Sequence, residues 1–217
     1  MRKPKLTLYF DLHSPYSYLA FYVIKNSAIF RACEVTYTPV LLVAYINAVG
    51  LKPPWSSPNK VNWIQTDVGR WCQDCGIPWK QGWPANYPFE ATTMEVQRAL
   101  ISCSLECPER FPEVVAVLYH AFWYEKKGVQ LPEIHGPLIA KVVGAELAAK
   151  IRGRTATDEV KSLLRQHTDS ALSGGSPGLP WIKATDLEGR EQSFWGFDHL
   201  GQVARFLRLG RLNEAHL

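Results

Sequence analysis

The sequence predicts an α/β protein in which the two ends of the chain build one sheet and the middle forms an insertion of helices. Three observations predict it. Apolar residues alternate near the N-terminus, the same strand pattern returns near residue 181, and the stretch between about residues 53 and 170 is typical of helices and loops. We therefore expect the order β-α-β, helices, β-β-α. Residues 1–52 and 173–217 are predicted to form one domain, and residues 53–172 an inserted all-helical domain.

The first strand and the first helix meet at a serine. Apolar side chains alternate over residues 6–12, which indicates a strand, and the apolar run over residues 18–24 indicates a helix. Ser14 and Pro15 between them fit a helix start, because a hydroxyl accepts from first-turn amides and proline suits the first helical position. Capping alone explains Ser14. A helix start that follows a strand also stabilises an anion such as a thiolate, so a functional role stays open.

The remaining elements follow from periodicity and turn residues. A second strand is expected at residues 35–40, and a hairpin around Asp186–Gly189 joins strands at 181–185 and 191–195. The helices that the spacing predicts lie near Thr92–Cys107, Pro112–Lys126, Asp158–Leu172 and over the last apolar face from Leu200 to Leu207.

Composition favours a small-molecule partner. The chain has 217 residues, 47% of them apolar, which is ample for a buried core. Its net charge of +4 is spread over the sequence without a basic block, so we expect neither nucleic-acid nor membrane-surface binding. No apolar stretch approaches the roughly 18 residues that span a bilayer, and residues 1–5 lead directly into a strand. We expect an intracellular protein.

The five cysteines do not resemble a secreted disulfide framework. Cys72 and Cys75 form a C-x-x-C, and Cys103 and Cys107 make a second, looser pair. Two such pairs can bind zinc, but the pattern places Cys103 on the inner face of a helix, where free cysteine is commonly buried. A redox C-x-x-C is expected at a helix start, whereas Cys72 lies within a predicted helix. We therefore expect no metal.

Several motifs together resemble a known family. They are Phe10–Ala20 (FDLHSPYSYLA), Lys52-Pro53-Pro54, Gly76-Ile77-Pro78, Gly178-Leu179-Pro180 and Trp195-Gly196-Phe197-Asp198. Over nearly its whole length the chain resembles the kappa class of glutathione transferases and the related 2-hydroxychromene-2-carboxylate isomerases. Both belong to the thioredoxin superfamily and are related to disulfide-bond-forming oxidoreductases. The resemblance implies a thioredoxin-like fold with a helical insertion, and glutathione as the cofactor.

The resemblance also implies a site. Ser14 would replace the nucleophilic cysteine of the oxidoreductases and donate a hydrogen bond to the sulfur of glutathione. Pro180 would be cis, leaving the backbone of Leu179 to pair with the cysteinyl part of glutathione; a plain turn is the alternative. Asp198 would receive the amino group of the γ-glutamyl end, and it also fits the N-cap of the last helix. The residues implied to bind the cofactor are Ser14, Pro15, Tyr16, Lys52, Leu179, Pro180, Phe197 and Asp198.

Two positions depart from the family pattern. Phe197 stands where the family usually has a serine, and Leu51 where it usually has an asparagine. Three functions remain open. The first is a glutathione transferase acting on a small apolar electrophile, and the second is a glutathione-dependent isomerase. The third is a non-catalytic ligand-binding relative. A disulfide oxidoreductase is disfavoured, because Ser14 and Ser17 occupy the places of its two cysteines. The resemblance implies a homodimer.

The electrophile side of the site is less defined. Its aromatic candidates are Trp55, Trp63, Trp71, Trp79, Trp83 and Trp123. They would line a pocket or fill a core, and we favour a core. His13, beside Ser14, is interpreted as a loop residue, with proton transfer as the alternative.

The C-terminal tripeptide carries a targeting hypothesis. Ala215-His216-Leu217 fits the small-basic-leucine form of the peroxisomal address, and a chance polar tail is the alternative. Kappa-class relatives occur in peroxisomes and mitochondria, so we expect a peroxisomal or mitochondrial protein, with the cytoplasm as a third location.

Overall fold

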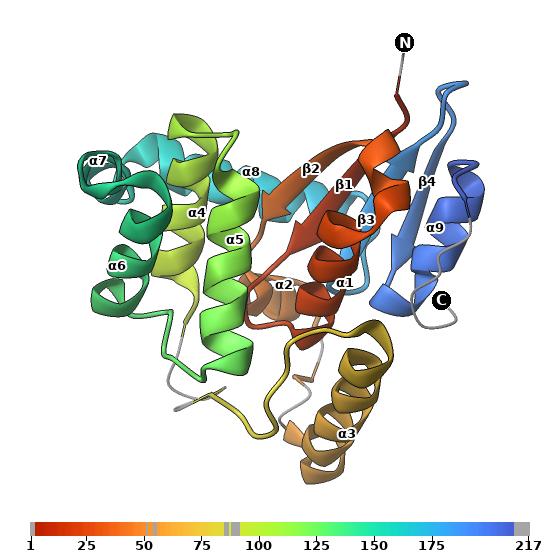
Figure 1. Ribbon diagram of the computed structural model, residues 1–217, viewed down its shortest axis with the longest axis horizontal. Coiled ribbons are helices and arrows are strands. Elements are labelled where there is room, and N and C mark those ends of the chain that lie inside the picture. The colour runs from red at the N-terminus through yellow and green to blue at the C-terminus, as the bar shows by residue number, and fades with distance from the viewer. Residues whose placement is uncertain (1–2, 51, 54–55, 85–86, 88–91, 211–217) are drawn as a thin grey trace.

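The two ends of the chain share one sheet, as predicted. A computed structural model describes residues 3–50, 52–53, 56–84, 87 and 92–210 (Figure 1). Within these residues one sheet has the order β2-β1-β3-β4. Its strands are β1 (Lys5–Phe10), β2 (Glu34–Pro39), β3 (Trp181–Thr185) and β4 (Glu191–Trp195). β1 pairs in parallel with β2 and antiparallel with β3, and β3 pairs antiparallel with β4. Leu8 thus lies between Tyr37 and Ile182. This is the mixed sheet of a thioredoxin-like fold.

Helices surround this sheet. They are α1 (Pro15–Asn26), α2 (Leu42–Ala48), α3 (Pro58–Cys75), α4 (Met94–Glu106), α5 (Phe111–Tyr119), α6 (Pro132–Val143), α7 (Ala145–Arg154), α8 (Asp158–Ser173) and α9 (Leu200–Phe206). In Figure 1, α1 lies in front of the sheet and part of α8 passes behind it, while α4 to α7 stand together at one side. α8 also contacts β2 directly.

Helix α2 begins without a local signal, which is why its sequence does not predict it. The residue at its N-cap, Leu41, provides no side-chain hydrogen bond. Instead Asp11, which follows β1, accepts the backbone N–H of Leu42 through Oδ2 at 2.7 Å. A carboxylate 31 residues earlier in the chain therefore does what an N-cap residue ordinarily does.

The helix predicted at Pro112–Lys126 is only partly correct. Helix α5 ends at Tyr119, and a π-helical turn, η3 (His120–Tyr124), follows it. Within this turn the buried Trp123 donates its indole N–H to the carbonyl of Leu12 at 3.1 Å. Periodicity in the sequence does not reveal such a contact, because it depends on a residue 111 positions away.

One cluster of buried apolar side chains connects the sheet with the insertion. It contains Leu8 and Phe10 of β1, Phe21 of α1 and Leu118 of α5. Tyr119 packs against both phenylalanines, with ring centroids 5.9 Å from Phe10 and 5.4 Å from Phe21. The helices of the insertion thus pack on α1 and the sheet, and the proposed domain borders near residues 52 and 173 stay a prediction.

Some predicted features lie outside the described residues: Leu51, Trp55 and the tripeptide Ala215-His216-Leu217. Among the helices that are described, none is both long and apolar enough to cross a membrane.

Candidate functional site

Ser14 caps the helix that follows β1. It is the N-cap of α1, with extended backbone (φ −87°, ψ 112°), and its Oγ accepts the backbone N–H of Ser17 at 3.1 Å. Pro15 takes the first helical position. The capping interpretation is therefore confirmed. A hydroxyl that accepts one hydrogen bond keeps its own proton as a donor, so Ser14 can cap the helix and still donate a hydrogen bond to a ligand.

The buried carboxylate of Asp11 holds this turn in place through hydrogen bonds. Asp11 is fully buried and accepts three hydrogen bonds, from the backbone N–H of His13 (2.9 Å), from Leu42 and from the Thr93 hydroxyl (2.9 Å). Burial raises the pKa of Asp11, and the charge of His13 and these bonds oppose that rise. Asp11 thereby ties the Ser14 turn to the starts of α2 and α4. Sequence reasoning did not select it; its signal is an acid directly after an apolar strand.

The loop opposite Ser14 holds a cis peptide. The Leu179–Pro180 bond is cis, which confirms the prediction against a plain turn. The carbonyl of Pro180 accepts the backbone N–H of Gly196 at 3.0 Å, so the loop is held against the end of β4. Gly178 is required there, because a Cβ at this position would lie 2.9 Å from Nε1 of Trp195.

Two adjacent cavities open between these elements. The first, which we call the Ser14 cavity, has a volume of about 520 Å³ and is lined by His13, Ser14 and Pro15 and by apolar side chains of α2 and α3. The second, the Asp198 cavity, has about 440 Å³ and is lined by residues of the cis-proline loop, of α3 and of residues 195–199. Tyr16, Leu179 and Trp195 line both. The two cavities therefore adjoin each other at these side chains.

The Asp198 cavity is suited to a positively charged group. It contains two carboxylates, Asp67 and Asp198, and one histidine, His199. The hydroxyl of Tyr16 donates to Oδ2 of Asp67 at 2.8 Å. Burial, the bond to Asp67 and the charges of both carboxylates raise the pKa of Tyr16, so its phenol stays protonated. Asp67 was missed from the sequence, because nothing local marks one acid on α3 as facing a cavity.

The structure brings most of the predicted cofactor residues together. Ser14, Pro15, Tyr16, Leu179, Pro180, Phe197 and Asp198 all line one or both cavities. Lys52 is exposed and is not among the described residues that line either one. Its role stays a prediction, as do the individual contacts of the other residues with a cofactor.

The capping role considered for Asp198 is wrong. A short 3-10 turn, η4 (Phe197–His199), precedes α9, whose N-cap position is His199 and has no side-chain hydrogen bond. The Asp198 side chain is 63% exposed, and its Oδ1 lies 3.3 Å from Nδ1 of His199. The apolar periodicity predicts the start of α9 correctly, but it does not predict the 3-10 turn that precedes this helix. Asp198 thus faces solvent and the cavity.

Phe197 contributes a packed wall instead of a polar contact. Its side chain is buried and meets Trp71 of α3 edge to face, with ring centroids 5.2 Å apart. The phenylalanine therefore fixes α3 against residues 195–199 and helps to shape the Asp198 cavity.

The predicted tryptophan cluster divides between core and wall. Trp123 is fully buried and stacks with Trp79 at 5.5 Å, whereas Trp83 stacks on Tyr87 at 4.7 Å and lines the Ser14 cavity. Trp63 is exposed. The core interpretation holds for Trp123, and the pocket interpretation holds for Trp83.

Cys33, Cys72, Cys103 and Cys107 are free thiols. Cys72 lies inside α3, as predicted, and burial raises its pKa to about 12. Cys103 is buried on α4. Among the described residues, no group of three or more His, Cys, Asp or Glu side chains is placed to hold a metal ion.

Comparison with known proteins identifies the family. A family model described as a DSBA-like thioredoxin domain matches residues 5–208. The chain belongs to the DSBA-like thioredoxin family. Within this family it is 30% identical, over 92% of its length and 89% of the relative, to "Glutathione s-transferase kappa 2" of Caenorhabditis elegans. The kappa-class resemblance of the sequence is therefore confirmed.

Solved structures agree on the fold of this family member. A 2-hydroxychromene-2-carboxylate isomerase superposes with a TM-score of 0.77 at 20% identity, covering 94% of each chain. The cytosolic disulfide reductase DsbM of Pseudomonas aeruginosa, whose structure was solved with GSH, gives a TM-score of 0.66 at 13% identity, covering 94% of this chain and 96% of that one. At these identities the likeness is one of fold.

Proposed function

We propose that this protein is a glutathione transferase of the kappa type, in which Ser14 stabilises the thiolate of glutathione for attack on a small apolar electrophile. The name of the C. elegans relative supports the class of activity. The two cavities, which share Tyr16, Leu179 and Trp195 in their walls, support a ligand as extended as a tripeptide.

The observation that carries the proposal is the position of Ser14. It lies at the N-terminus of α1 and lines a cavity together with Leu179 of the cis-proline loop. A thiolate held there meets the hydroxyl donor and the positive end of the helix dipole. Lowering a thiol pKa by about 1.5 units from its usual 8.5 requires about 2 kcal/mol, which these two interactions together can supply.

In this proposal the rest of the glutathione follows the two cavities. The backbone of Leu179 pairs with the cysteinyl residue, as strand-like peptide ligands pair with a free backbone edge. The ammonium of the γ-glutamyl end enters the Asp198 cavity, where Asp67 and Asp198 provide negative charge. The apolar part of the Ser14 cavity, which includes Leu42, Ile46 and Trp83, receives the electrophile.

An isomerase of the 2-hydroxychromene-2-carboxylate type would use the same site. It differs in outcome, because the thiolate adds to the substrate and is later expelled, so that glutathione is recovered. A transferase consumes glutathione and leaves a conjugate. Mass spectrometry of the products after turnover decides between them, and a ligand-binding relative would give no product.

Calorimetric titration of glutathione, combined with thiolate absorbance across pH, tests the role of Ser14. We expect binding, with a thiol pKa lowered in the complex. Ser14→Ala should return that pKa towards the value in free glutathione. A bound thiol whose pKa is the same in wild type and variant would remove Ser14 from the mechanism, and absence of binding at millimolar glutathione would refute the cofactor.

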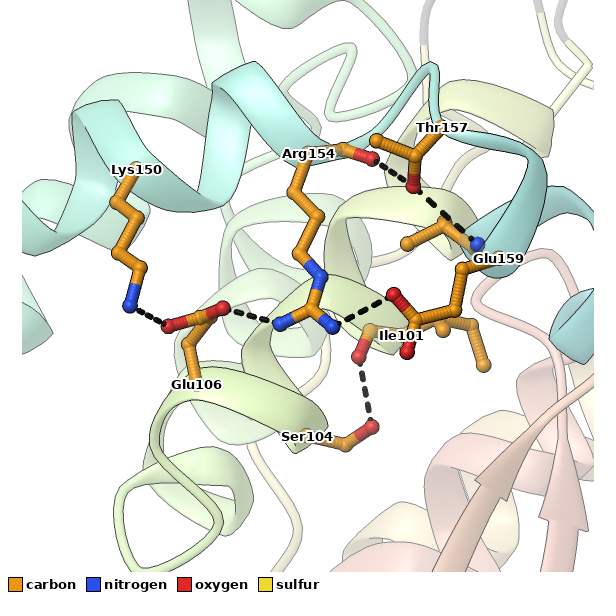
Figure 2. A network of polar contacts seen from close by, with 8 residues as sticks. Ile101, Ser104, Glu106, Lys150, Arg154, Thr157 and Glu159 are labelled. Carbon is orange, nitrogen blue, oxygen red and sulfur yellow. Dashed lines mark hydrogen bonds and ion pairs between the residues drawn. The ribbon is translucent and has the colours of Figure 1, made fainter.

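Ser104→Ala is a matched control. Ser104 lies on α4 and lines neither cavity, and its hydroxyl donates to the carbonyl of Ile101 at 2.7 Å (Figure 2). The variant removes a hydroxyl of the same kind and should leave the thiol pKa of bound glutathione unchanged.

Location and assembly are separate proposals. We propose that Ala215-His216-Leu217 directs the protein to peroxisomes, so that deletion of Leu217 abolishes peroxisomal import of a fluorescent fusion. Import of the deleted form would refute this. We also propose a homodimer, which sedimentation of the purified protein would test.

A further inference from the structure

His13 is a buried histidine held tightly beside Ser14. Only 1% of His13 is exposed to solvent. Its ring stacks on Phe122, with centroids 5.6 Å apart and planes at 15°, and lies edge-on to Tyr87, with centroids 5.3 Å apart and planes at 82°. The backbone around it is satisfied, because its N–H donates to Asp11 and its carbonyl accepts the Tyr87 hydroxyl at 2.9 Å. Its ring is thus a fixed part of the wall of the Ser14 cavity.

The ring itself has unused hydrogen-bonding capacity. Nε2 of His13 is buried and has no hydrogen-bond partner among the residues that the structure describes. Buried polar groups in proteins are nearly always paired, so an unpaired one beside a ligand cavity points to a partner that arrives with the ligand. Burial also lowers the pKa of His13, which favours the neutral imidazole, with one N–H to donate.

Two hydroxyls near this wall are already engaged, and the amide of Asn62, which also lines the cavity, is exposed to solvent. The hydroxyl of Tyr87 donates to the carbonyl of His13, and the hydroxyl of Tyr16 donates to Asp67. Ser14 is assigned to the sulfur by the proposed function. Most of the remaining wall is apolar, with Leu42 and Ile64 among its members. His13 is therefore the buried polar group in this wall that is left for the second substrate.

We propose that His13 recognises the electrophile, and that the Ser14 cavity takes an apolar electrophile bearing an oxygen that gains negative charge on thiolate attack, as the carbonyl of a conjugated ketone does. This inference rests on the proposed function and deepens it. In such an addition the sulfur forms a bond to the β-carbon, and the π electrons move to the carbonyl oxygen. The N–H of His13 donates to this enolate oxygen. Water then protonates the α-carbon, which replaces the proton that the thiol released, and no leaving group departs.

Two electrophiles separate this role from a structural one. Benzylideneacetone carries the conjugated carbonyl, whereas benzyl chloride has no oxygen and loses chloride on substitution. With saturating glutathione, His13→Leu should lower kcat/KM for benzylideneacetone by about tenfold or more and for benzyl chloride by less than about threefold. His13→Gln, which keeps a donor, should recover part of the loss for the ketone. An equal loss for both electrophiles would overturn the inference, as would no loss for the ketone.

His120→Leu is the matched control, because His120 lies in the π-helical turn and lines neither the Ser14 cavity nor the Asp198 cavity. It should leave the ratio of the two kcat/KM values unchanged.

Glutathione titration of each variant tests the proposed transferase function separately from the proposed role of His13. Unchanged glutathione affinity with a selective loss for the ketone supports the role of His13. A wild-type protein that binds glutathione but turns over neither electrophile would overturn the inference while leaving the cofactor in place. Absence of glutathione binding by the wild type would refute the proposed function first.

Discussion

Ser14 and Thr157 have the same local role in two different regions of the molecule. Each is the N-cap of a helix, with extended backbone, and each hydroxyl oxygen accepts a backbone N–H three residues later. They differ in the fate of the hydroxyl proton. Thr157 donates it to the carbonyl of Arg154 at 2.9 Å (Figure 2). For Ser14 no acceptor is found among the described residues.

The surroundings of Thr157 and Ser14 also differ in how many of their polar groups are paired within the protein. Around Thr157 the helices α4, α7 and α8 are connected by ion pairs, in which Arg154 contacts both Glu106 and Glu159 and Lys150 reaches Glu106 at 2.5 Å (Figure 2). In this network each charged side chain has a partner of opposite charge within the network. The Ser14 turn is buried and lines a cavity, and among the described residues its Ser14 hydroxyl proton and Nε2 of His13 have no hydrogen-bond partner. The comparison shows that an N-cap hydroxyl becomes a candidate ligand-binding group when the fold provides no acceptor for its proton.

The largest effect is expected when each of the two N-cap residues, Ser14 and Thr157, is replaced by alanine. Ser14→Ala should lower the turnover of glutathione conjugation by a factor of about ten or more, because the thiolate loses its hydroxyl donor. Thr157→Ala should leave turnover unchanged. Both variants should lose about 1 kcal/mol of unfolding free energy, the usual contribution of an N-cap, as measured by urea denaturation. Equal turnover of the two variants would contradict the distinction.

The next effect concerns the acidic cavity. Asp198→Ala should weaken glutathione binding about tenfold, measured by calorimetry, because the γ-glutamyl ammonium loses a carboxylate partner. Since Asp198 is exposed and caps no helix, the melting temperature without ligand should not change. Asp169→Ala, an exposed acid on α8, is the control and should bind glutathione as the wild type does. A lower melting temperature for Asp198→Ala would restore a structural role.

A smaller effect is expected for Tyr16, one of the residues that line both cavities. Tyr16→Phe removes the hydroxyl that donates to Asp67 and should weaken glutathione binding about fivefold, since one hydrogen bond contributes about 1 kcal/mol. Tyr22→Phe, on the same helix, removes a hydroxyl that bonds to the carbonyl of Gly76, outside both cavities, and should have no effect. Equal affinities of the two variants would show that Asp67 is positioned without Tyr16.

The smallest effect is a pH dependence that lies away from the cavities. Burial lowers the pKa of His135 and of His167, so the unfolded chain binds protons more readily than the folded chain. Stability should therefore fall as the pH drops below about 6.5, the usual histidine pKa. Thermal unfolding from pH 7.5 to 5.5 checks this, and His135→Gln should flatten the curve. An unchanged slope would show that other groups dominate.

Much of the fold is predictable from local patterns. The strands at residues 181–185 and 191–195 and the turn between them match the structure, because alternation and turn residues are local signals. Helix α8 begins at the predicted Asp158, where Thr157 and two acids mark the start. Helix α2 escapes prediction because its cap comes from Asp11.

The candidate site is predictable only in part, and for the same reason. Ser14, Leu179 and Asp198 follow from motifs that resemble a family, and the fold places them on adjoining cavities. Asp67 reaches the same place from α3, where no motif selects it. His13 looks like an ordinary loop residue in sequence.

The sequence by itself determined the order of the elements, the cap at Ser14 and the family, since each depends on residues close together in the chain or on a recognisable motif. Tertiary structure alone decided which polar groups are satisfied. The carboxylate of Asp11 accepts from three donors, whereas Nε2 of His13 has no partner in the part of the chain that the structure describes. Hydrogen bonds between distant segments depend on how the helices pack on the sheet, and local periodicity carries no information about that packing.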